Sequence, residues 1–185
     1  MRVLKKEDVL KNKPELLEEI KDGAVFIYPT DTIYGIGCIA TNNAAVNRIR
    51  EIKARDAKPF SVIAPSLDWI RKNCVVSDAA NKWLVKLPGS YTLILPLKNL
   101  SAVSTSTNAG LKSLGVRIPN HWIKDIVKEL GQPIITTSAN VSGEIPSSIL
   151  KDMLRFDVDF IIFEGSLNNK PSQVVDLTKG EKIIR

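Results

Sequence analysis

The sequence has few of the side chains on which metal enzymes and nucleophilic enzymes usually depend. It contains a single histidine, His121, and two cysteines, Cys38 and Cys74, which lie in unrelated contexts. Because these residues lack metal-type spacing, neither a zinc site nor a disulfide framework is expected. We expect both cysteines to be buried apolar residues in a reducing compartment. His121 is interpreted as a first-turn residue of a helix rather than as a catalytic base.

Long apolar runs are also missing. No stretch approaches the ~20 residues that a membrane-spanning helix requires, and residues 1–13 lack the apolar core of a signal peptide. The phosphate-binding P-loop, the dinucleotide-binding glycine fingerprint and the nucleophile elbow are absent from the sequence as well. We therefore predict a cytoplasmic protein that has no membrane partner and does not hold phosphate in a glycine cradle.

The composition is typical of a globular protein. Hydrophobic residues make up 44% and charged residues 25% of the 185 residues, so we predict one domain over residues 1–185. The formal net charge is +6, and lysine and arginine are spread along the chain rather than gathered in a tail. A basic face must therefore be assembled by folding, and it would favour an anionic partner such as a nucleotide or RNA.

Strand and helix patterns alternate along the chain. Strands are predicted at 24–28, 61–64, 90–97, 115–118, 133–137, 158–163, 173–177 and 181–185. Helices are predicted at 14–21, 43–54, 66–72, 77–87, 121–130 and 147–155, the second with Thr41 as its N-cap. Residues 29–37 and 98–113 are predicted to be loops. The alternation predicts an α/β fold, and the adjacent strands at the end favour a mixed sheet.

Two stretches carry much of the polar chemistry. Lys53, Arg55 and Lys58 place three cations within six residues, at the end of a predicted helix where the helix dipole favours them. Residues 136–140 form a row of small hydroxyl and amide side chains after a predicted strand. The first stretch is either helix-end chemistry or a clamp for anionic oxygens, and the second is either a turn or a polar shelf. If they face one cavity, they suit a polyanion together with a small polar substrate.

Other polar side chains stand at predicted strand ends: Thr30, Thr32, Arg117, Ser172 and Arg185. In an α/β sheet, such positions tend to converge on one crevice. The set suits catalysis by orientation and charge stabilisation, without a side-chain nucleophile. Each residue also has a structural alternative as a turn former or a surface group. Asp31 remains open between a base, a magnesium ligand and a turn-capping residue.

Six stretches, taken in order, carry a family resemblance. They are Pro29–Gly37, Lys53–Arg55, Leu87–Leu93, Val116–Pro119, Thr137–Gly143 and Val174–Asp176. Together they resemble the YrdC/TsaC family, the threonylcarbamoyl-AMP synthases. The resemblance implies a twisted mixed parallel and antiparallel sheet, with flanking helices, around a basic cavity. It also implies synthesis of threonylcarbamoyl-AMP from L-threonine, bicarbonate and ATP with release of pyrophosphate, the first step of tRNA threonylcarbamoyladenosine modification.

The resemblance also implies roles for individual residues. Four correspond to the family's threonine-contacting positions: Thr32, Arg117, Ser138 and Ser172. Seven correspond to positions that hold ATP: Lys53, Arg55, Lys58, Ser113, Asn140, Ser148 and Arg185. Among these, Lys53 and Arg55 would stabilise the charge that develops on pyrophosphate, together with Mg²⁺ bound to ATP. The sequence departs from the family at Asp56, where proline is usual, and at Ile63, where many members have a histidine.

Two other functions remain open. One is a non-catalytic module of the same fold that binds double-stranded RNA or tRNA. The other is a carbamoyl-transfer domain like that of hydrogenase maturation, which the absence of acylphosphatase and zinc-finger segments disfavours. The chain ends at Arg185, where longer family members continue into a linker and a second domain. We therefore expect the short form, which would pass its adenylate to a separate tRNA-modification transferase complex.

Overall fold

The computed structural model describes residues 1–54 and 58–184. Its strands are β1 (Arg2–Leu4), β2 (Phe26–Tyr28), β3 (Gly35–Gly37), β4 (Ser61–Ile63), β5 (Tyr91–Pro96), β6 (Ser113–Arg117), β7 (Ile134–Ser138), β8 (Phe160–Ile162), β9 (Gln173–Asp176) and β10 (Lys182–Ile183). Its α-helices are α1 (Lys6–Lys11), α2 (Lys13–Lys21), α3 (Asn43–Ile52), α4 (Leu67–Asn73), α5 (Asp78–Leu84), α6 (Thr105–Asn108), α7 (Ile123–Leu130) and α8 (Leu150–Met153), and a 3-10 helix, η1, spans Leu100–Ala102.

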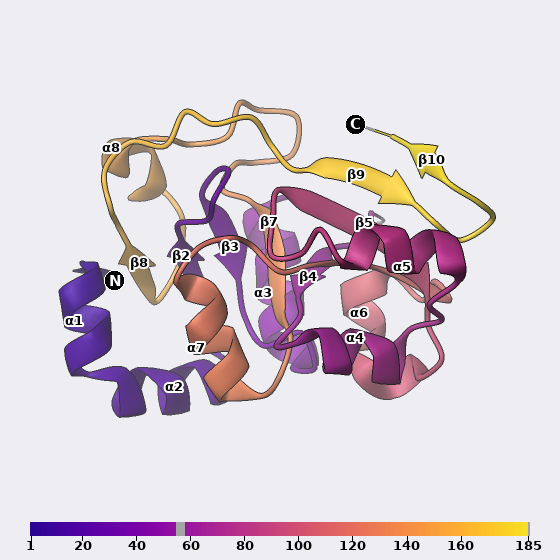
Figure 1. Cartoon of the computed structure of the whole chain (residues 1–185). Helices are drawn as coiled ribbons and strands as arrows, with labels where there is room; N and C mark the ends of the chain where they lie inside the picture. The colour runs from indigo at the N-terminus through magenta and orange to yellow at the C-terminus, as the bar shows by residue number, and fades with distance from the viewer. Residues whose placement is uncertain (55–57, 185) are drawn as a thin grey trace.

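The strands form one sheet in the order β1-β8-β2-β3-β7-β4-β6-β5-β9-β10. β8 pairs in parallel with β1 and β2, β4 with β6, and β5 with β9. The remaining pairs are antiparallel, with β3 between β2 and β7 and with β7 next to β4. The predicted mixed α/β sheet is therefore confirmed. Figure 1 shows α1, α2 and α7 gathered at the β8 and β2 end of the sheet, and α4, α5 and α6 at the β5 and β9 end.

Alternation along the strands gives the sheet two apolar faces. Ile27, Val62 and Ile161 belong to a core cluster that includes buried residues of α3, α4 and α5. Phe26 and Phe160, which neighbour these residues along the same strands, belong to a second cluster that includes buried residues of α1, α2 and α7. Since successive strand side chains point to opposite faces, each cluster fills one side of the sheet. We refer to these sides as the first face and the second face.

Glycines in β3 let an aromatic ring lie flat on the second face. A Cβ atom on Gly37 would stand 2.5 Å from the backbone oxygen of Ile135 and 2.7 Å from the Tyr28 ring. Because Gly37 has no Cβ atom, the Tyr28 ring can lie across β3, and its hydroxyl donates to the Ile135 carbonyl oxygen at 2.8 Å. Burial raises the pKa of Tyr28 well above its ordinary value. The glycines at 35 and 37, which suggested a loop, therefore belong to a strand.

Several predicted boundaries were wrong where tertiary contacts outweigh the local signal. The N-cap of α3 is Asn42 and not Thr41, because the Asn42 side chain accepts the Ala45 N–H at 3.1 Å. The stretch 98–113 contains η1 and α6, the latter tied to the body by a bond from the Thr107 hydroxyl to the Ala40 carbonyl oxygen. The predicted helix at 147–155 is shortened to α8, since the backbone N–H of Ser147 bonds to Ala139 instead.

The N-terminal segment was not predicted at all. β1 has three residues and α1 has six, and among the α1 side chains only Val9 is buried. Such short, exposed elements carry almost no hydrophobic periodicity, so they form because β1 pairs with β8 and α1 packs on the second face.

Helix α7 begins at Ile123, two residues later than predicted. No helix in the described ranges is long and apolar enough to cross a membrane.

The two cysteines are both buried, as predicted. Cys38 and Cys74 are completely inaccessible and belong to the core cluster of the first face. Burial raises the pKa of Cys74 to about 11 and also raises the pKa of Cys38. Both thiols are therefore protonated at neutral pH and serve as packing groups.

Candidate active site

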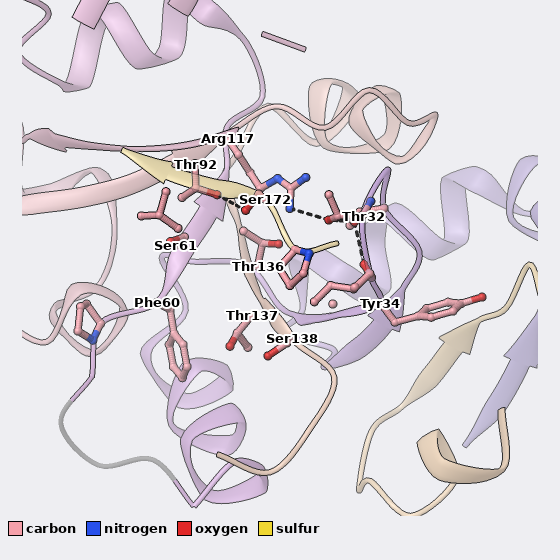
Figure 2. Close-up of a pocket in the computed structure, with 16 residues that line it drawn as sticks. Thr32, Tyr34, Phe60, Ser61, Thr92, Arg117, Thr136, Thr137, Ser138 and Ser172 are labelled. Carbon is pink, nitrogen blue, oxygen red and sulfur yellow. Dashed lines mark hydrogen bonds between the residues drawn. The ribbon is translucent and has the colours of Figure 1, made fainter. Parts of the chain in front are cut away.

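A pocket opens on the part of the second face that the helices leave uncovered. Ser61 pairs with Thr136 and with Gly115, so Ser61 and Thr136 lie side by side on adjacent strands, and Arg117 lies one step along this face from Gly115. The pocket has a volume of about 200 Å³. This is smaller than the roughly 300–1,000 Å³ of pockets that hold drug-sized ligands, so it suits a compact molecule. Figure 2 shows its lining side chains.

Hydroxyl groups dominate the lining. Eight serine and threonine residues line the pocket: Thr30, Thr32, Ser61, Thr92, Thr136, Thr137, Ser138 and Ser172. Tyr34, Phe60 and Val174 are among the apolar groups that complete the wall. Within the described ranges, Arg117 is the one charged side chain in this lining. The pocket can therefore offer many neutral donors and acceptors around one fixed guanidinium group.

The Arg117 end of the pocket is built on a buried ion pair. The side chain of Arg117 is 6% exposed, and its Nη2 atom lies 2.5 Å from Oδ1 of Asp31, whose side chain is 9% exposed. Arg117 Nη1 also donates to the Thr32 hydroxyl at 3.3 Å, the contact drawn from Arg117 in Figure 2. The Thr32 hydroxyl in turn lies 2.9 Å from that of Thr30. The loop 29–34 and the end of β6 are thus joined by polar contacts inside the pocket.

A second hydroxyl pair forms the wall next to Arg117. The side-chain oxygens of Thr92, in β5, and Ser172, just before β9, are 2.8 Å apart. Both side chains are about 5% exposed, so their mutual bond satisfies one polar contact for each. Ser172 belongs to the β8–β9 connection, which passes over the top of the sheet in Figure 1. The site is therefore assembled from both the sheet and an overlying connection.

The other end of the pocket joins the two stretches that the sequence singled out. Lys53 is 1% exposed, and its ammonium group donates to the carbonyl oxygens of Ser138 and Asn140, both at 2.6 Å. It also lies 3.2 Å from Oδ1 of Asn140. The Asn140 amide group donates to the carbonyl oxygens of Val141 and Glu144. Lys53 thus anchors the polar shelf formed by residues 136–140, which the sequence left open as either a turn or a shelf.

The structure brings some of the predicted site residues together and leaves others apart. All four predicted threonine-contacting residues, Thr32, Arg117, Ser138 and Ser172, line the one pocket. Of the predicted ATP-holding residues, Lys53 and Asn140 lie behind its Ser138 end. Ser113, Ser148 and Lys58 are outside the pocket lining, and Lys58 is exposed. Arg55 and Arg185 lie outside the described residues, as does Asp56.

Ile63, the position where many family members have a histidine, is not part of the pocket wall. Its side chain is completely buried in the second-face core cluster. The neighbouring position on the same face of β4 is Ser61, which does line the pocket. Ile63 pairs in register with Arg117, so the two residues lie side by side on adjacent strands.

Sequence reasoning missed several lining residues. Ser61 and Thr92 are polar residues in otherwise apolar strands, and each lines the pocket, whereas Thr136 belongs to the polar row 136–140 that the sequence had already indicated. A search for hydroxyl side chains in otherwise apolar strands would have found Ser61 and Thr92. Arg50 was also missed: its guanidinium group donates to the Lys58 carbonyl at 3.2 Å and lies 4.6 Å from the centre of the Phe60 ring. Arg50 thereby holds the chain that leads into the pocket wall.

His121 lies outside the pocket and supports the overlying connection. Its Nε2 atom is 3.0 Å from Oε2 of Glu164, whose other oxygen accepts the Trp122 indole N–H at 2.7 Å. Burial lowers the pKa of His121, and Glu164 opposes that shift. Tyr34 donates to the Gly165 carbonyl at 2.7 Å, and burial raises the pKa of this tyrosine. His121 precedes the N-cap of α7, so the prediction that it is a first-turn residue of this helix was wrong.

Comparison with known proteins adds a family match. The family model for Sua5, YciO and YrdC, described as "Telomere recombination", matches residues 18–185. The uncharacterized protein YciO of Escherichia coli K12 is 31% identical over 178 residues, covering 92% of this chain and 85% of YciO. A Methanocaldococcus jannaschii protein named "Putative threonylcarbamoyl-AMP synthase" is 37% identical over 177 residues, covering 91% of this chain and 81% of that protein.

Solved structures share the fold. The crystal structure of E. coli YciO has a TM-score of 0.84 at 28% identity and covers 100% of this chain and 93% of YciO. The crystal structure of P. abyssi Sua5 complexed with L-threonine has a TM-score of 0.86 at 27% identity. It covers all of this chain, which spans 56% of the Sua5 chain. Full-length HypF, at 24% identity and a TM-score of 0.81, shares the fold.

Proposed function

Because the chain belongs to the Sua5/YciO/YrdC family, we propose that it makes threonylcarbamoyl-AMP from L-threonine, bicarbonate and ATP. One observation carries the proposal. The four residues that the family resemblance assigns to threonine, from four separate segments of the chain, line a single pocket of about 200 Å³. The relative named as a synthase and the threonine-bound Sua5 structure support the same reaction.

The pocket chemistry fits the amino-acid substrate. Arg117 offers a guanidinium group to a carboxylate, and the surrounding hydroxyls can bond to an amine, a hydroxyl or a carbamate. Its small volume leaves the nucleotide to extend past the Ser138 end, where Lys53 and Asn140 lie. Arg55, Lys58, Ser113, Ser148 and Arg185 remain proposed ATP contacts on the family resemblance alone.

Magnesium enters the proposal as part of the nucleotide substrate. In the described ranges, no three histidine, cysteine, aspartate or glutamate residues gather into a metal-binding group. Asp31, the acidic residue beside the pocket, is engaged by Arg117. Since Mg²⁺ is commonly held by substrate phosphates with few protein ligands, Mg–ATP is the form that this site suits.

The proposed reaction needs no protein nucleophile. The threonine amine attacks carbon dioxide, formed from bicarbonate, and loses a proton to give a carbamate. A carbamate oxygen then attacks the α-phosphorus of ATP, and the bond from that phosphorus to the pyrophosphate oxygen breaks. Pyrophosphate leaves with the bonding electrons, and nearby cations stabilise its charge. The contribution of this chain is to hold the two substrates in line and to exclude water from the adenylate.

The direct test is a threonine-dependent release of pyrophosphate. Folded protein is incubated with Mg–ATP, bicarbonate and threonine, and pyrophosphate is measured with a coupled assay while the adenylate is identified by mass. Reactions that lack threonine or bicarbonate, and reactions with serine or valine in place of threonine, are the controls. Folded protein that releases no pyrophosphate above these controls would refute the synthase.

RNA binding and hand-over to a tRNA-modification transferase complex are proposed partners of the same reaction. The net charge of +6 supports an encounter with RNA. A gel shift with tRNA at several salt concentrations tests direct contact, because phosphate contacts make binding salt-dependent. If tRNA binds while ATP gives no thermal stabilisation, the alternative of a non-catalytic RNA-binding module is favoured over the synthase.

A further inference from the structure

Asp31 occupies a position that the proposed reaction does not explain by itself. It does not line the pocket, yet its carboxylate contacts Arg117, the one charged lining side chain in the described ranges. Oδ2 of Asp31 accepts the backbone N–H of Asn120 at 3.0 Å and lies 3.3 Å from the Ser90 hydroxyl. The Asp31 carbonyl oxygen accepts the Asn169 amide at 3.4 Å. Asp31 therefore joins its own loop to three other segments of the chain, at residues 90, 117–120 and 169.

We propose that Asp31 is a positioning residue that makes the pocket selective for a zwitterion over a simple anion. This inference rests on the proposed function and deepens it. Asp31 fixes the direction of the Arg117 guanidinium group, and its negative charge compensates the positive charge of that group within a buried pair. An ion pair with no net charge favours a ligand that carries one positive and one negative charge, as threonine does. An uncompensated guanidinium group would instead attract inorganic anions.

The remaining contacts of Arg117 support a role in orientation. Nη1 reaches Thr32 while Nη2 reaches Asp31, so the plane of the guanidinium group is set from two sides. Bidentate recognition of a carboxylate depends on that plane, because the N–H groups of arginine form a rigid fork. Neutral asparagine at position 31 keeps the shape of the side chain but removes the charge that holds the fork.

The chain offers a matched control for removal of this carboxylate. Asp159 also joins an arginine and a backbone N–H: Oδ2 lies 2.7 Å from Nη1 of Arg48 and accepts the Val25 N–H at 2.8 Å. Asp159 is outside the pocket lining, and its side chain is 35% exposed. Asp31→Asn and Asp159→Asn therefore remove the same kinds of contact, and only the first removes them behind Arg117.

The experiment compares wild type, Asp31→Asn and Asp159→Asn in two assays. In the synthase assay, we expect Asp31→Asn to raise the threonine KM at least tenfold, with kcat changed less than threefold. Sulfate should inhibit this variant competitively with threonine at a concentration at least tenfold lower than for wild type. Asp159→Asn should match wild type in both respects. Urea unfolding of all three proteins shows whether the variants remain folded.

The second assay does not depend on turnover. Sulfate is titrated without substrates, and the thermal midpoint of each protein is followed. We expect sulfate to stabilise Asp31→Asn more than the other two proteins. The inference is overturned if folded Asp31→Asn keeps the sulfate response of wild type, or if Asp159→Asn reproduces its behaviour. Absence of pyrophosphate release by wild type would refute the proposed function alone, because the sulfate titration still tests the pair.

Discussion

The second face of the sheet is apolar under α2 and α7 and polar in the pocket, although both parts follow one alternation. Phe26 and Phe160 are completely buried, and their rings stack with centroids 4.9 Å apart. Thr136 and Ser61 occupy equivalent inward positions on β7 and β4, yet they line an open cavity. In both parts, the same alternation along the strands directs these side chains to the second face. What differs is the cover, since helices pack on the first part whereas the second part lines a pocket.

The largest predicted effect is in the covered part. Phe160→Ala should lower the free energy of unfolding by about 3–5 kcal/mol, because it removes a large aromatic ring and leaves a cavity. Urea denaturation measures the change. Leu100→Ala is the control, since Leu100 is 56% exposed and its truncation should cost about 0.5 kcal/mol or less. A loss below about 1 kcal/mol for Phe160→Ala would mean that the covered part is not tightly packed.

The next largest predicted effect is the loss of stability when Gly37, which lies under the Tyr28 ring, or Gly115, which lies beside the pocket residue Ser61, is replaced by alanine. A Cβ atom on Gly37 meets the backbone oxygen of Ile135 at 2.5 Å, while one on Gly115 meets the Ser61 hydroxyl oxygen at 2.3 Å. Overpacking of this kind costs about 1–3 kcal/mol. We expect Gly37→Ala to cost more than Gly115→Ala, because a backbone group cannot rotate away. Urea denaturation measures both.

A double variant sharpens the comparison at Gly115. Ser61→Ala combined with Gly115→Ala should recover most of the stability lost by Gly115→Ala, since the hydroxyl is the nearest obstacle. The interaction energy comes from the double-mutant cycle. Strict additivity of the two single changes would show that Ser61 is not what opposes a side chain at this position.

The Lys53→Met variant tests whether the Ser138 end of the pocket contributes to stability and activity. Lys53→Met should lower the free energy of unfolding by about 1–3 kcal/mol, because the Ser138 and Asn140 carbonyl oxygens lose their donor. On the proposed function, threonine-dependent pyrophosphate release should also fall to background. Lys72→Met, on an exposed face of α4, is the control for removal of a lysine charge. Full activity in a folded Lys53→Met protein would contradict a role for Lys53 in the site.

A hydroxyl change in the pocket should separate stability from activity. Thr92→Val removes the bond to Ser172, which should cost about 0.5–1.5 kcal/mol, while the threonine KM rises about tenfold. Thr178→Val also removes one hydroxyl bond, the charge-assisted bond to Asp176 at 2.7 Å, away from the pocket. Unfolding curves and steady-state kinetics measure both variants. Equal KM values for the two would show that the Thr92–Ser172 pair is not a substrate wall.

The smallest predicted effect is the reactivity of the two cysteines that are buried in the core cluster of the first face. The raised pKa of Cys74, about 11, leaves little thiolate at pH 8, and burial also raises the pKa of Cys38. Alkylation by iodoacetamide, followed by mass, should therefore be slow for the folded protein and fast in urea. Because a raised pKa favours the thiol, the rate should increase as the pH approaches 11. Rapid labelling of folded protein at pH 8 would contradict this packing.

The local sequence predicted those strands and helices in which apolar residues form a clear run or repeat. The short apolar run in 133–137 and the β-rich run in 90–97 indicated strands, and both are present as β7 and β5. The pattern failed where an element depends on its neighbours. β3 has glycines because the Tyr28 ring crosses it, and β1 exists because β8 offers an edge. Neither cause is visible within a short window of sequence.

The candidate site was predictable to a similar extent. Family motifs pointed to Thr32 and Arg117, which the structure places 3.3 Å apart through their side-chain atoms. The partner of Arg117 was not predictable, because Asp31 is 86 residues away and had three plausible local roles. The ion pair with Arg117 was not among them. Lys53 remains a predicted ATP contact, and the binding of its ammonium group to the shelf carbonyl oxygens was not predictable from the sequence.

The sequence by itself determined the class of fold and the supply of hydroxyl and cationic side chains. These follow from residue chemistry and from periods of two and 3.6, which are local properties. Only the tertiary structure decided that the site lies on a face of the sheet and not at its edge, and that Asp31 stands behind Arg117. Such choices depend on strand order and register, which bring together residues far apart in the chain.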